Sequence, residues 1–457
     1  MTECTQPRLE SKAPDGRTFT AAFDGGAITS DGGAPLLRLV DDRCGILERF
    51  GQCFQDFRDQ SRVKFTATQL ATQRVLSIAL GYEDLNDHDF LRNDPLLAAA
   101  VGLDQQNGQK LASSVTLGRI ENGSPGLSRE DRYRRIHLDQ DKVDQLLIDL
   151  LVEAHDTPPE EVVLDLDATD AKIHGKQEGR FYHGYYDEYC YLPLYIFAGD
   201  HILGARLRRA DEDGAAQSTD ELDRIYEGLR AAWPDVRLVI RADSGFCRDW
   251  LLSWCEERHG VDYVIGLARN PRLQAILEPT LDEVKKRHEV SLKAERDFHT
   301  FAYRTKDSWS RPRRIVGKAE HLQKGTNPRF LVTSFTRRQW QSRALYEDLY
   351  CERGEMENRI KEQQLDLFAD RVSCHWERGN QLRMYYSAIA YTLLEALRRL
   401  ALAGTEMARA QCGTIRLRFL KIGARIKCTA RRVWIHLSEH CPWRDEFVRA
   451  WQRLMPT

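Results

Sequence analysis

Residues 344–368 read ALYEDLYCERGEMENRIKEQQLDLF, a stretch that is typical of one long helix. Tyr350, Arg353 and Glu357 stand three and four residues apart, so their side chains share one helical face. The same spacing, continued in both directions, adds three more polar side chains to this face: Tyr346, Lys361 and Gln364. A packed helix presents an apolar face to its neighbours. The polar stripe therefore predicts a helix that serves a functional site.

Two aspartates elsewhere in the chain end apolar runs that predict strands. Asp167 closes the run EVVLDLD, and Asp243 closes the run VRLVIRAD. In sheets flanked by helices, ligands bind at the carboxyl ends of the strands. Together with Glu357 on the helix, the two aspartates supply the carboxylates that a metal-dependent phosphoryl-transfer site needs. The sequence predicts these three residues as catalytic metal ligands.

Other polar residues near these acids have alternative interpretations. Asp165 lies two residues before Asp167 and so on the same strand face, which makes it an alternative ligand. Asp170 is expected to cap the following turn. Three further charged residues are expected to form ion pairs on the surface: Asp187, Glu188 and Arg241. His174 and His183 have no partner at metal-ligand spacing, so they are expected at most to contact substrate.

The composition is that of a globular protein with a large core. The chain has 457 residues, of which 42% are hydrophobic and 30% charged, which predicts about two to four domains. No stretch approaches the roughly 20 apolar residues that cross a bilayer, and the first residues lack an apolar signal core. We expect a cytoplasmic protein with no membrane partner. Its 11 cysteines lack zinc-site spacing and are expected to be reduced thiols.

Basic residues gather toward the C-terminus, although the formal net charge of the chain is only −2. From His375 onward there are 15 Lys and Arg against 6 Asp and Glu, a local net charge of +9. This distribution predicts a basic region that contacts phosphates. The candidate contacts are Arg416, Arg418, Lys421 and Arg425. A solvated surface of long basic side chains would have the same composition.

The N-terminal third of the chain reads as mainly helical. Residues 17–50 predict a hairpin followed by a helix that starts near Pro35, and residues 66–155 show apolar side chains every three to four positions. The short helix in LASSVTLGRIENGS offers hydroxyl and basic side chains that could contact a DNA backbone. Capping and surface exposure explain the same residues equally well.

After residue 155 the pattern changes from helical to β-rich. Residues 161–268 predict the order β-β-β-α-β-α-β, which describes a mixed sheet with helices on its faces. Residues 290–336 form three alternating segments rich in Arg and Lys, which predict an inserted antiparallel module. The site helix must return to the main sheet after this insertion. It is expected to end near Phe368.

Three motifs in this order resemble bacterial insertion-sequence transposases of the DDE type. They are Asp167-Ala168-Thr169, Asp243-Ser244-Gly245-Phe246 and Tyr350-x-x-Arg353-x-x-x-Glu357. The segments HGKQEGRFYHGYYDEYCYLPLYIF, GLARNPRL, ENRIKEQQLDLFADR and RLRFLKIGARI are also similar to the branch with a long helical N-terminal region. One departure is visible. The family often places a lysine where Gln364 stands here, whereas Lys361 lies one turn after Glu357 on the same face.

The resemblance implies an α/β fold with a ribonuclease H-like core: a mixed sheet flanked by helices and interrupted by a β-rich insertion, with an α-helical N-terminal region and a basic C-terminal region. The implied domains are an N-terminal region that binds DNA ends, a divided catalytic core, a β insertion, and a C-terminal region for DNA contact or dimerisation. Their boundaries are 1–155, 156–289 with 337–405, 290–336, and 406–457.

The implied activity is nicking of double-stranded DNA at transposon ends, followed by attack of the freed 3′ hydroxyl on target DNA. Two Mg²⁺ ions, which Mn²⁺ can replace, would be held by Asp167, Asp243 and Glu357. Arg353 would grip a phosphate bidentately and Tyr350 would donate one hydrogen bond. The pairing of two DNA ends implies at least a homodimer on DNA.

A hairpin intermediate would require an exposed aromatic side chain to receive a flipped base. Trp309, in the turn-like segment KDSWSRP, is the first candidate within the insertion, and Trp340 is the next. Either tryptophan could instead cover the small core of the insertion itself.

Overall fold

The computed structural model describes residues 8–104, 108–123 and 131–455. Its contacts divide the chain into two compact units. The first unit comprises Met1–His137 and Leu393–Thr457, and the second comprises Leu138–Thr392. The predicted division at residue 155 differs from this one, because helix α7 (Gln140–Glu153) lies in the second unit. The basic C-terminal region shares a unit with the N-terminal helices.

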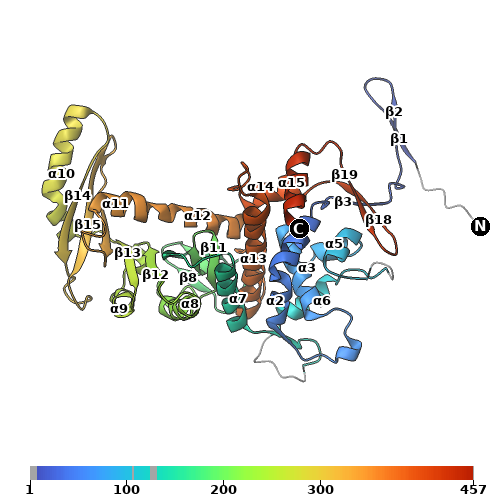
Figure 1. The fold of residues 1–457 in the computed structure, drawn as a ribbon, viewed down its shortest axis with the longest axis horizontal. Coiled ribbons are helices and arrows are strands. Elements are labelled where there is room, and N and C mark those ends of the chain that lie inside the picture. Colours follow the sequence, from blue (N-terminus) through green and yellow to red (C-terminus); the bar gives the residue numbers. More distant parts are fainter. Residues whose placement is uncertain (1–7, 105–107, 124–130, 456–457) are drawn as a thin grey trace, which may run out of the picture. The chain divides into compact units, whose positions relative to one another are not determined.

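A nine-stranded mixed sheet forms the centre of the second unit (Figure 1). The main path runs β11-β10-β6-β12-β13-β17-β15-β14, and β16 pairs with β15. Strand β12 is parallel to β6 and β13, and the other neighbours are antiparallel. This arrangement confirms the predicted mixed sheet flanked by helices. The strands are β6 (Glu161–Ala168), β10 (Leu194–Ala198), β11 (His201–Arg206), β12 (Arg237–Ala242), β13 (Val261–Leu267), β14 (Glu295–Tyr303), β15 (Arg313–Leu322), β16 (Gly325–Thr326) and β17 (Arg329–Thr333).

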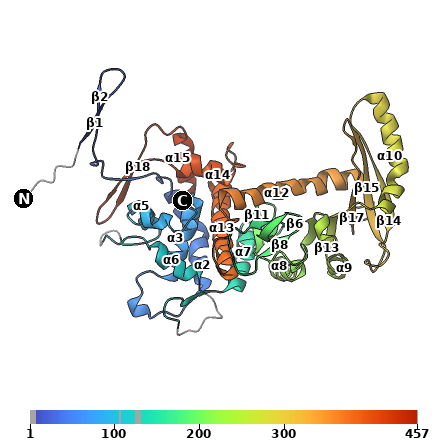
Figure 2. The same ribbon diagram turned by 180° about the vertical axis from the view of Figure 1, so that it is seen from behind.

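The strands expected in the insertion do not make a separate sheet. Strand β17 pairs antiparallel with β13, with Val264 opposite Thr333, so β17, β15 and β14 continue the main sheet. Helix α10 (Pro271–Ser291) lies at the same end of the sheet as β14 and β15 (Figure 2). It buries Leu273, Leu277 and Val284 in the core that these strands share. The alternating sequence predicted the strands correctly, but it carried no information about which strand they would join.

The two faces of the sheet carry different cores, because side chains alternate along each strand. On β6 and β12, Leu164 and Ile240 belong to the larger core, which helices α8 (Ser218–Ala232) and α9 (Asp249–Glu257) cover. Val239 of β12 belongs to a second core that contains Leu345 and Leu349 of the site helix. The site helix therefore lies on the face opposite α8 and α9 (Figure 1).

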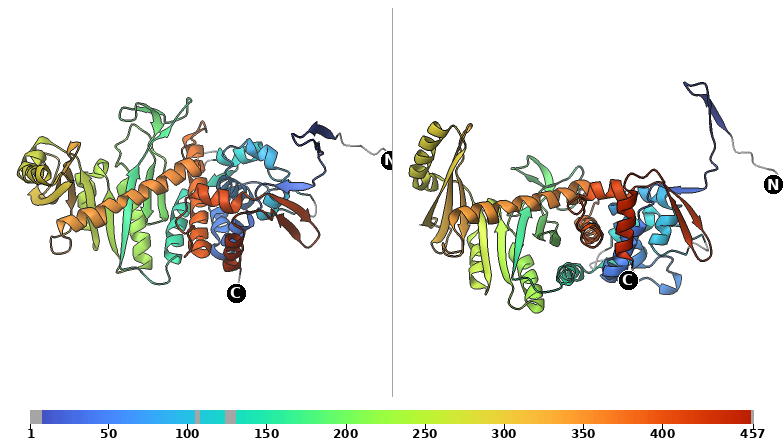
Figure 3. Two further views of the ribbon diagram at one scale, coloured as in Figure 1. Left: turned by 90° about the horizontal axis from the view of Figure 1, so that it is seen from above. Right: turned by 45° about the horizontal axis from the view of Figure 1, so that its top comes forward.

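The predicted long helix is a continuous helical run with irregular winding, drawn in orange in Figure 3. It begins at Ser342, and its last helical residue is Asp366, which agrees with the expected end near Phe368. Phe368 itself has φ 60°, a left-handed conformation that ends a helix. The segments in order are α11 (Ser342–Ala344), the π-helical η3 (Leu345–Tyr350), the 3₁₀ turn η4 (Cys351–Arg353), α12 (Gly354–Lys361) and the π-helical η5 (Glu362–Asp366).

A small sheet, a short turn and most of helix α13, whose last residues belong to the first unit, are further elements of the second unit. Strands β7 (Ala171–Lys172), β9 (Glu188–Tyr191) and β8 (Phe181–His183) form a small antiparallel sheet immediately after β6. The 3₁₀ turn η2 (Ser244–Phe246) follows β12. Helix α13 (Glu377–Leu397) is the second strong helix that the sequence predicts.

The first unit contains the predicted N-terminal helices. Pro35 starts α1, Thr66 and Gln69 form a capping box at the start of α3, and Gly81 has φ 92° after its end. The predicted hairpin differs, because β2 pairs with the preceding β1, whereas β3 pairs with β18 near the C-terminus. The helices are α1 (Pro35–Cys44), α2 (Ile46–Gln52), α3 (Ala67–Ala79), α4 (Asp87–Leu91), α5 (Pro95–Ala100), α6 (Ser114–Glu121), α14 (Cys412–Ile415) and α15 (Arg444–Leu454).

The remaining elements of this unit are β1 (Leu9–Lys12), β2 (Thr18–Ala21), β3 (Ala27–Thr29), β4 (Phe54–Asp56), β5 (Ile136–Leu138, which crosses the boundary of the two units), η1 (Gln60–Arg62), η6 (Arg398–Leu402), η7 (Arg416–Leu420), β18 (Ala424–Cys428) and β19 (Val433–Leu437). Among the described residues of both units, no helix is long and apolar enough to cross a membrane.

Candidate active site

Two neighbouring parallel strands bring Asp167 and Asp243 to one edge of the sheet. Strands β6 and β12 are paired so that Asp165 lies opposite Arg241. Asp167 and Asp243 each follow two residues later, so they leave the same face of the sheet at its carboxyl edge. This is the face that the helical run covers. Both strand-end aspartates therefore lie where the sequence predicts them.

The helical run brings Arg353 and Glu357 to the same edge. Arg353 donates from Nη1 to Oδ2 of Asp167 at 3.2 Å and from Nη2 to Oε1 of Glu357 at 2.6 Å. The side chains of Arg353 and Asp167 are each 17% exposed, and that of Glu357 is 47% exposed. One guanidinium thus joins the first and the third predicted acid.

Tyr350 and Asp243 meet at the start of the turn after β12. Oδ1 of Asp243 accepts a hydrogen bond from the backbone N–H of Gly245 at 2.8 Å. A methyl group placed on Gly266 would lie 2.8 Å from the Tyr350 hydroxyl oxygen and 2.8 Å from the backbone nitrogen of Ser244. The absence of a side chain at Gly266 therefore lets the Tyr350 hydroxyl approach the backbone beside Asp243.

Burial and the neighbouring charges alter the protonation of Asp167. The pKa of Asp167 is raised to about 6, chiefly by burial; Arg353 lowers it, and the charges of Asp243 and Glu357 add to the rise. Burial also raises the pKa of Tyr350, which keeps its hydroxyl a hydrogen-bond donor at neutral pH. Negative charge accumulates at this edge, and one arginine compensates for only part of it.

The carboxylates of Asp167, Asp243 and Glu357 have the chemistry that a hard divalent cation needs, since such cations prefer clustered carboxylate oxygens. Residues 8–104, 108–123 and 131–455 nevertheless contain no three acidic, histidine or cysteine side chains close enough together to hold a metal ion. Asp167 and Glu357 both face Arg353 instead. The three acids share one edge of the sheet, and the arginine supplies the positive charge between two of them.

Asp165 and Arg241 form a buried ion pair, which corrects the predicted surface position of Arg241. Arg241 is 6% exposed and Asp165 is 3% exposed. Nε and Nη2 of Arg241 donate to the two carboxylate oxygens of Asp165 at 2.5 and 2.7 Å. Since both oxygens already accept from the guanidinium, Asp165 is engaged away from the metal role that we considered for it. A charged residue within each apolar strand was the sequence signal for this pair.

The other charged residues near the small sheet have local partners. The Glu188 carboxylate pairs with Lys172 at 2.5 Å, and Asp187 accepts a hydrogen bond from the Tyr182 hydroxyl. Burial raises the pKa of Asp170. The backbone carbonyl of Asp170 accepts a hydrogen bond from the side-chain amide of Gln364 at 2.9 Å.

Gln364 and Lys361 have different surroundings on the site helix. The Gln364 amide is half-buried and holds the chain just after β6, since it also lies 3.4 Å from the Thr169 hydroxyl. Lys361 is exposed. Glutamine at position 364 therefore makes a structural contact in this chain, and a phosphate contact by Lys361 stays a prediction.

The expectation that Trp309 is an exposed aromatic side chain is wrong. Trp309 is 4% exposed, its ring centroid lies 5.9 Å from that of Tyr303, and the Arg313 guanidinium lies over its indole. The turn folds back so that the indole joins the large core of the sheet, and the neighbouring Ser310 bonds to Asp249 of α9. Trp340 is half-buried beside Phe335. Large exposed aromatic rings occur instead in and around the β8–β9 hairpin: Tyr182, Tyr185 and Tyr189.

Three of the four basic residues predicted to contact DNA near the C-terminus have partners within the first unit. Arg416 donates to the backbone carbonyl of Ala79 at 2.9 Å, at the end of α3. Arg418 lies over the Trp443 ring, and Lys421 pairs with Asp31 at 2.7 Å. Arg425 is exposed on β18. The DNA contacts of these residues stay predictions.

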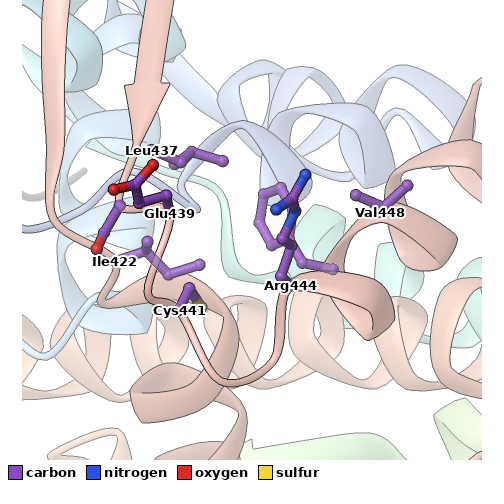
Figure 4. Close-up of a pocket in the computed structure, with 8 residues that line it drawn as sticks. Ile422, Leu437, Glu439, Cys441, Arg444 and Val448 are labelled. Atoms are coloured by element: carbon purple, nitrogen blue, oxygen red, sulfur yellow. The ribbon is translucent and has the colours of Figure 1, made fainter.

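The first unit also contains a pocket, shown in Figure 4. It has a volume of about 330 Å³. Its lining residues include Ile422, Leu437, Glu439, Cys441, Arg444 and Val448. None of the three predicted acids lines it, so the carboxylate edge of the second unit is the candidate active site.

Comparisons with known proteins identify a family for this chain. The model of the family described as transposase DDE domain group 1 matches residues 12–457. No protein of curated function matches the sequence. A cryo-EM structure of the piggyBac transposase synaptic complex with hairpin DNA is similar over 84% of this chain and 78% of that chain, with 11% sequence identity and a TM-score of 0.39.

Proposed function

The chain belongs to the transposase DDE domain group 1 family, and from this premise we propose that it moves its own insertion sequence by cutting and joining DNA. It binds the terminal inverted repeats, hydrolyses phosphodiester bonds at the ends and joins the 3′ hydroxyls to target DNA. The observation that carries this proposal is the shared edge of Asp167, Asp243 and Glu357. Membership of the family makes the protein a DNA transposase whose chemistry depends on divalent metal.

Asp167, Asp243 and Glu357 would hold divalent cations, Mg²⁺ or Mn²⁺, which supply an activated hydroxyl and neutralise charge on the phosphate. Asp167 is the acid that the other two share as a neighbour, since the charges of both Asp243 and Glu357 act on it. Glu357 reaches it from the helix. Arg353 now joins these two side chains, so a bound cation would compete with its guanidinium, which would then be available to a phosphate.

Arg353 and Tyr350 hold the scissile strand. A guanidinium offers planar, paired N–H donors that match two phosphate oxygens, so Arg353 fixes the orientation of the phosphate. The raised pKa of Tyr350 keeps its hydroxyl protonated, and from beside Asp243 it donates one hydrogen bond. Positioning of this kind contributes much of the rate of a phosphoryl transfer. Lys361 adds a contact on the same helical face.

A homodimer on double-stranded DNA is part of the proposal. Joining requires that both ends of the element are held together, which two copies of the chain achieve. The basic C-terminal region, including the exposed Arg425, contributes phosphate contacts.

The test uses the full chain and the DNA that flanks its gene. Wild-type protein is expected to nick this DNA at the inverted repeats with Mg²⁺ or Mn²⁺ and not without metal, as gel electrophoresis of labelled ends would show. Precleaved ends should then be joined to a target plasmid. Cleavage without joining would favour a structure-selective nuclease, and binding without cleavage would favour a DNA-binding protein derived from a transposase.

A further inference from the structure

Arg241 donates hydrogen bonds to two separate elements of the second unit. Its Nε and Nη2 groups donate to Asp165 on β6, and its Nη1 group donates to the backbone carbonyl oxygen of Leu349 at 2.5 Å. Leu349 lies in the helical run that carries Arg353 and Glu357. One guanidinium therefore ties two strands of the sheet to the site helix.

The position of this contact follows from the sequence spacing. Arg241 lies two residues before Asp243, and Asp165 lies two residues before Asp167, on the same faces of paired strands. Leu349 directly precedes Tyr350 and lies two helical turns before Glu357. The three elements that carry the three acids thus converge on Arg241, one layer below the acids.

The winding of the helix makes this anchor point important. Residues 345–350 are wound as a π-helix and residues 351–353 as a 3₁₀ turn. Such segments change the direction in which later side chains point, and they often mark functional sites or strain. Leu345 and Leu349 attach the helix to the sheet by apolar contacts. Apolar contacts are non-directional, whereas the hydrogen bond to the Leu349 carbonyl fixes rotation and register.

Stability alone is a weak reason for this pair. Removing two charges from water costs free energy that their attraction often fails to recover, and well-packed apolar residues of similar volume can be at least as stable. An apolar residue in place of Arg241 could not donate a hydrogen bond to the backbone carbonyl of Leu349, as the Arg241 guanidinium does in addition to its two bonds to Asp165. Glu352, 3.6 Å from Arg241, is mostly exposed and contributes little to the anchor.

We propose that Arg241 is a positioning residue of the active site: held by Asp165, it fixes the register of the site helix so that Arg353 and Glu357 face Asp167. The proposal rests on the proposed function for its effect on cleavage. Its structural part, the tether between sheet and helix, stands on the three hydrogen bonds. The guanidinium touches no substrate in this role.

The test compares single substitutions with a double substitution. Arg241→Met or Asp165→Leu alone leaves one buried charge without its partner and is expected to lower the melting temperature by about 10 °C. The double variant removes both charges and is expected to recover most of that loss. It still lacks the donor for the Leu349 carbonyl. Single-turnover DNA cleavage by the folded double variant should therefore stay about 10²-fold below wild type, with DNA affinity unchanged.

Arg313 provides a matched control in the same unit. It also donates two hydrogen bonds to one carboxylate, Glu256, at 2.8 and 3.0 Å, and a third to Asp249 at 2.6 Å. None of these partners belongs to the site helix. The double variant R313M/E256L should lose stability without losing cleavage per folded molecule. Wild-type cleavage by R241M/D165L, or equal cleavage losses in both double variants, would overturn the positioning role.

Hydrogen exchange separates this inference from the proposed function. Amides of residues 345–361 in the protein without DNA should exchange faster in R241M/D165L than in wild type, while amides of α8 should not change. Unchanged exchange in the helix would overturn the tether even if cleavage fell. If wild-type protein failed to cleave any DNA, the proposed function would fall, and the exchange measurement would still decide the tether.

Discussion

Two layers of charged residues lie on the same face of β6 and β12, and they differ in burial and in charge balance. The inner pair, Asp165 and Arg241, is almost fully buried and its charges match. The outer acids are Asp167 and Asp243 at the ends of the strands and Glu357 on the helix above them, and Arg353 pairs with Asp167 and Glu357. Only two residues along each strand separate the layers.

The difference shows how one strand face can serve two purposes. The inner pair is satisfied within the protein, since both carboxylate oxygens of Asp165 accept from Arg241. The outer acids outnumber their arginine, and the pKa of Asp167 is raised to about 6 by burial and by its like-charged neighbours. A cluster that retains negative charge favours an external cation. The inner layer therefore belongs to the fold and the outer layer to the chemistry.

The largest expected effect is on the outer layer. Glu357→Gln keeps the size of the side chain but removes the charge that would hold a cation, so cleavage should fall by at least about 10³-fold. Gel assays with Mg²⁺ would measure the loss, and a filter-binding assay should show DNA affinity near the wild-type value. A Glu357→Gln variant that cleaves at the wild-type rate would remove Glu357 from the catalytic set.

Arg353→Gln should have the next largest effect. The variant loses the paired donors for a phosphate, so single-turnover cleavage is expected to fall about 10²-fold. Arg353→Lys keeps the charge but not the paired geometry, and it should recover only part of the rate. Full recovery by lysine would mean that Arg353 acts as a charge alone.

Gly266→Ala tests the close approach of Tyr350 to the strand ends. The added methyl group would lie 2.8 Å from the Tyr350 hydroxyl oxygen, so either the helix or β13 must shift. We expect a loss of about 1–3 kcal/mol in the free energy of unfolding, measured by urea denaturation, and slower cleavage. Gly354→Ala is the control, because a methyl group there meets no atom within 4 Å. Equal effects of both substitutions would contradict the close approach.

Lys361→Ala should have the smallest effect. An exposed lysine that contacts one phosphate adds affinity without fixing geometry, so cleavage should fall less than about tenfold. The slope of log affinity against log salt concentration should decrease by about one. An unchanged slope would show that Lys361 makes no phosphate contact.

Much of this arrangement could be predicted from local sequence. The apolar runs before Asp167 and Asp243 identified both strands, and the helical spacing placed Arg353 and Glu357 on one face. The partners of Arg241 could not be predicted, because its burial depends on the pairing of β6 with β12. Its partner Asp165 lies 76 residues away in the sequence. The same limit explains Trp309, whose burial depends on how its turn packs against Tyr303 and against Asp249 of α9. It also explains the strands of the insertion, whose pairing with β13 is a long-range contact.

The most direct test of the two-layer account is thermal unfolding of Asp165→Asn and Asp167→Asn, with and without Mn²⁺. Without metal, Asp165→Asn should melt well below wild type, because Arg241 stays buried with a neutral partner. Asp167→Asn should melt at or above wild type, since burial disfavours its charge and Arg353 keeps Glu357 as a partner, whereas Asp165→Asn removes the buried partner of Arg241. Mn²⁺ should raise the melting temperature of wild type and Asp165→Asn but not of Asp167→Asn. The reverse pattern, or equal gains from Mn²⁺ in both variants, would contradict the account.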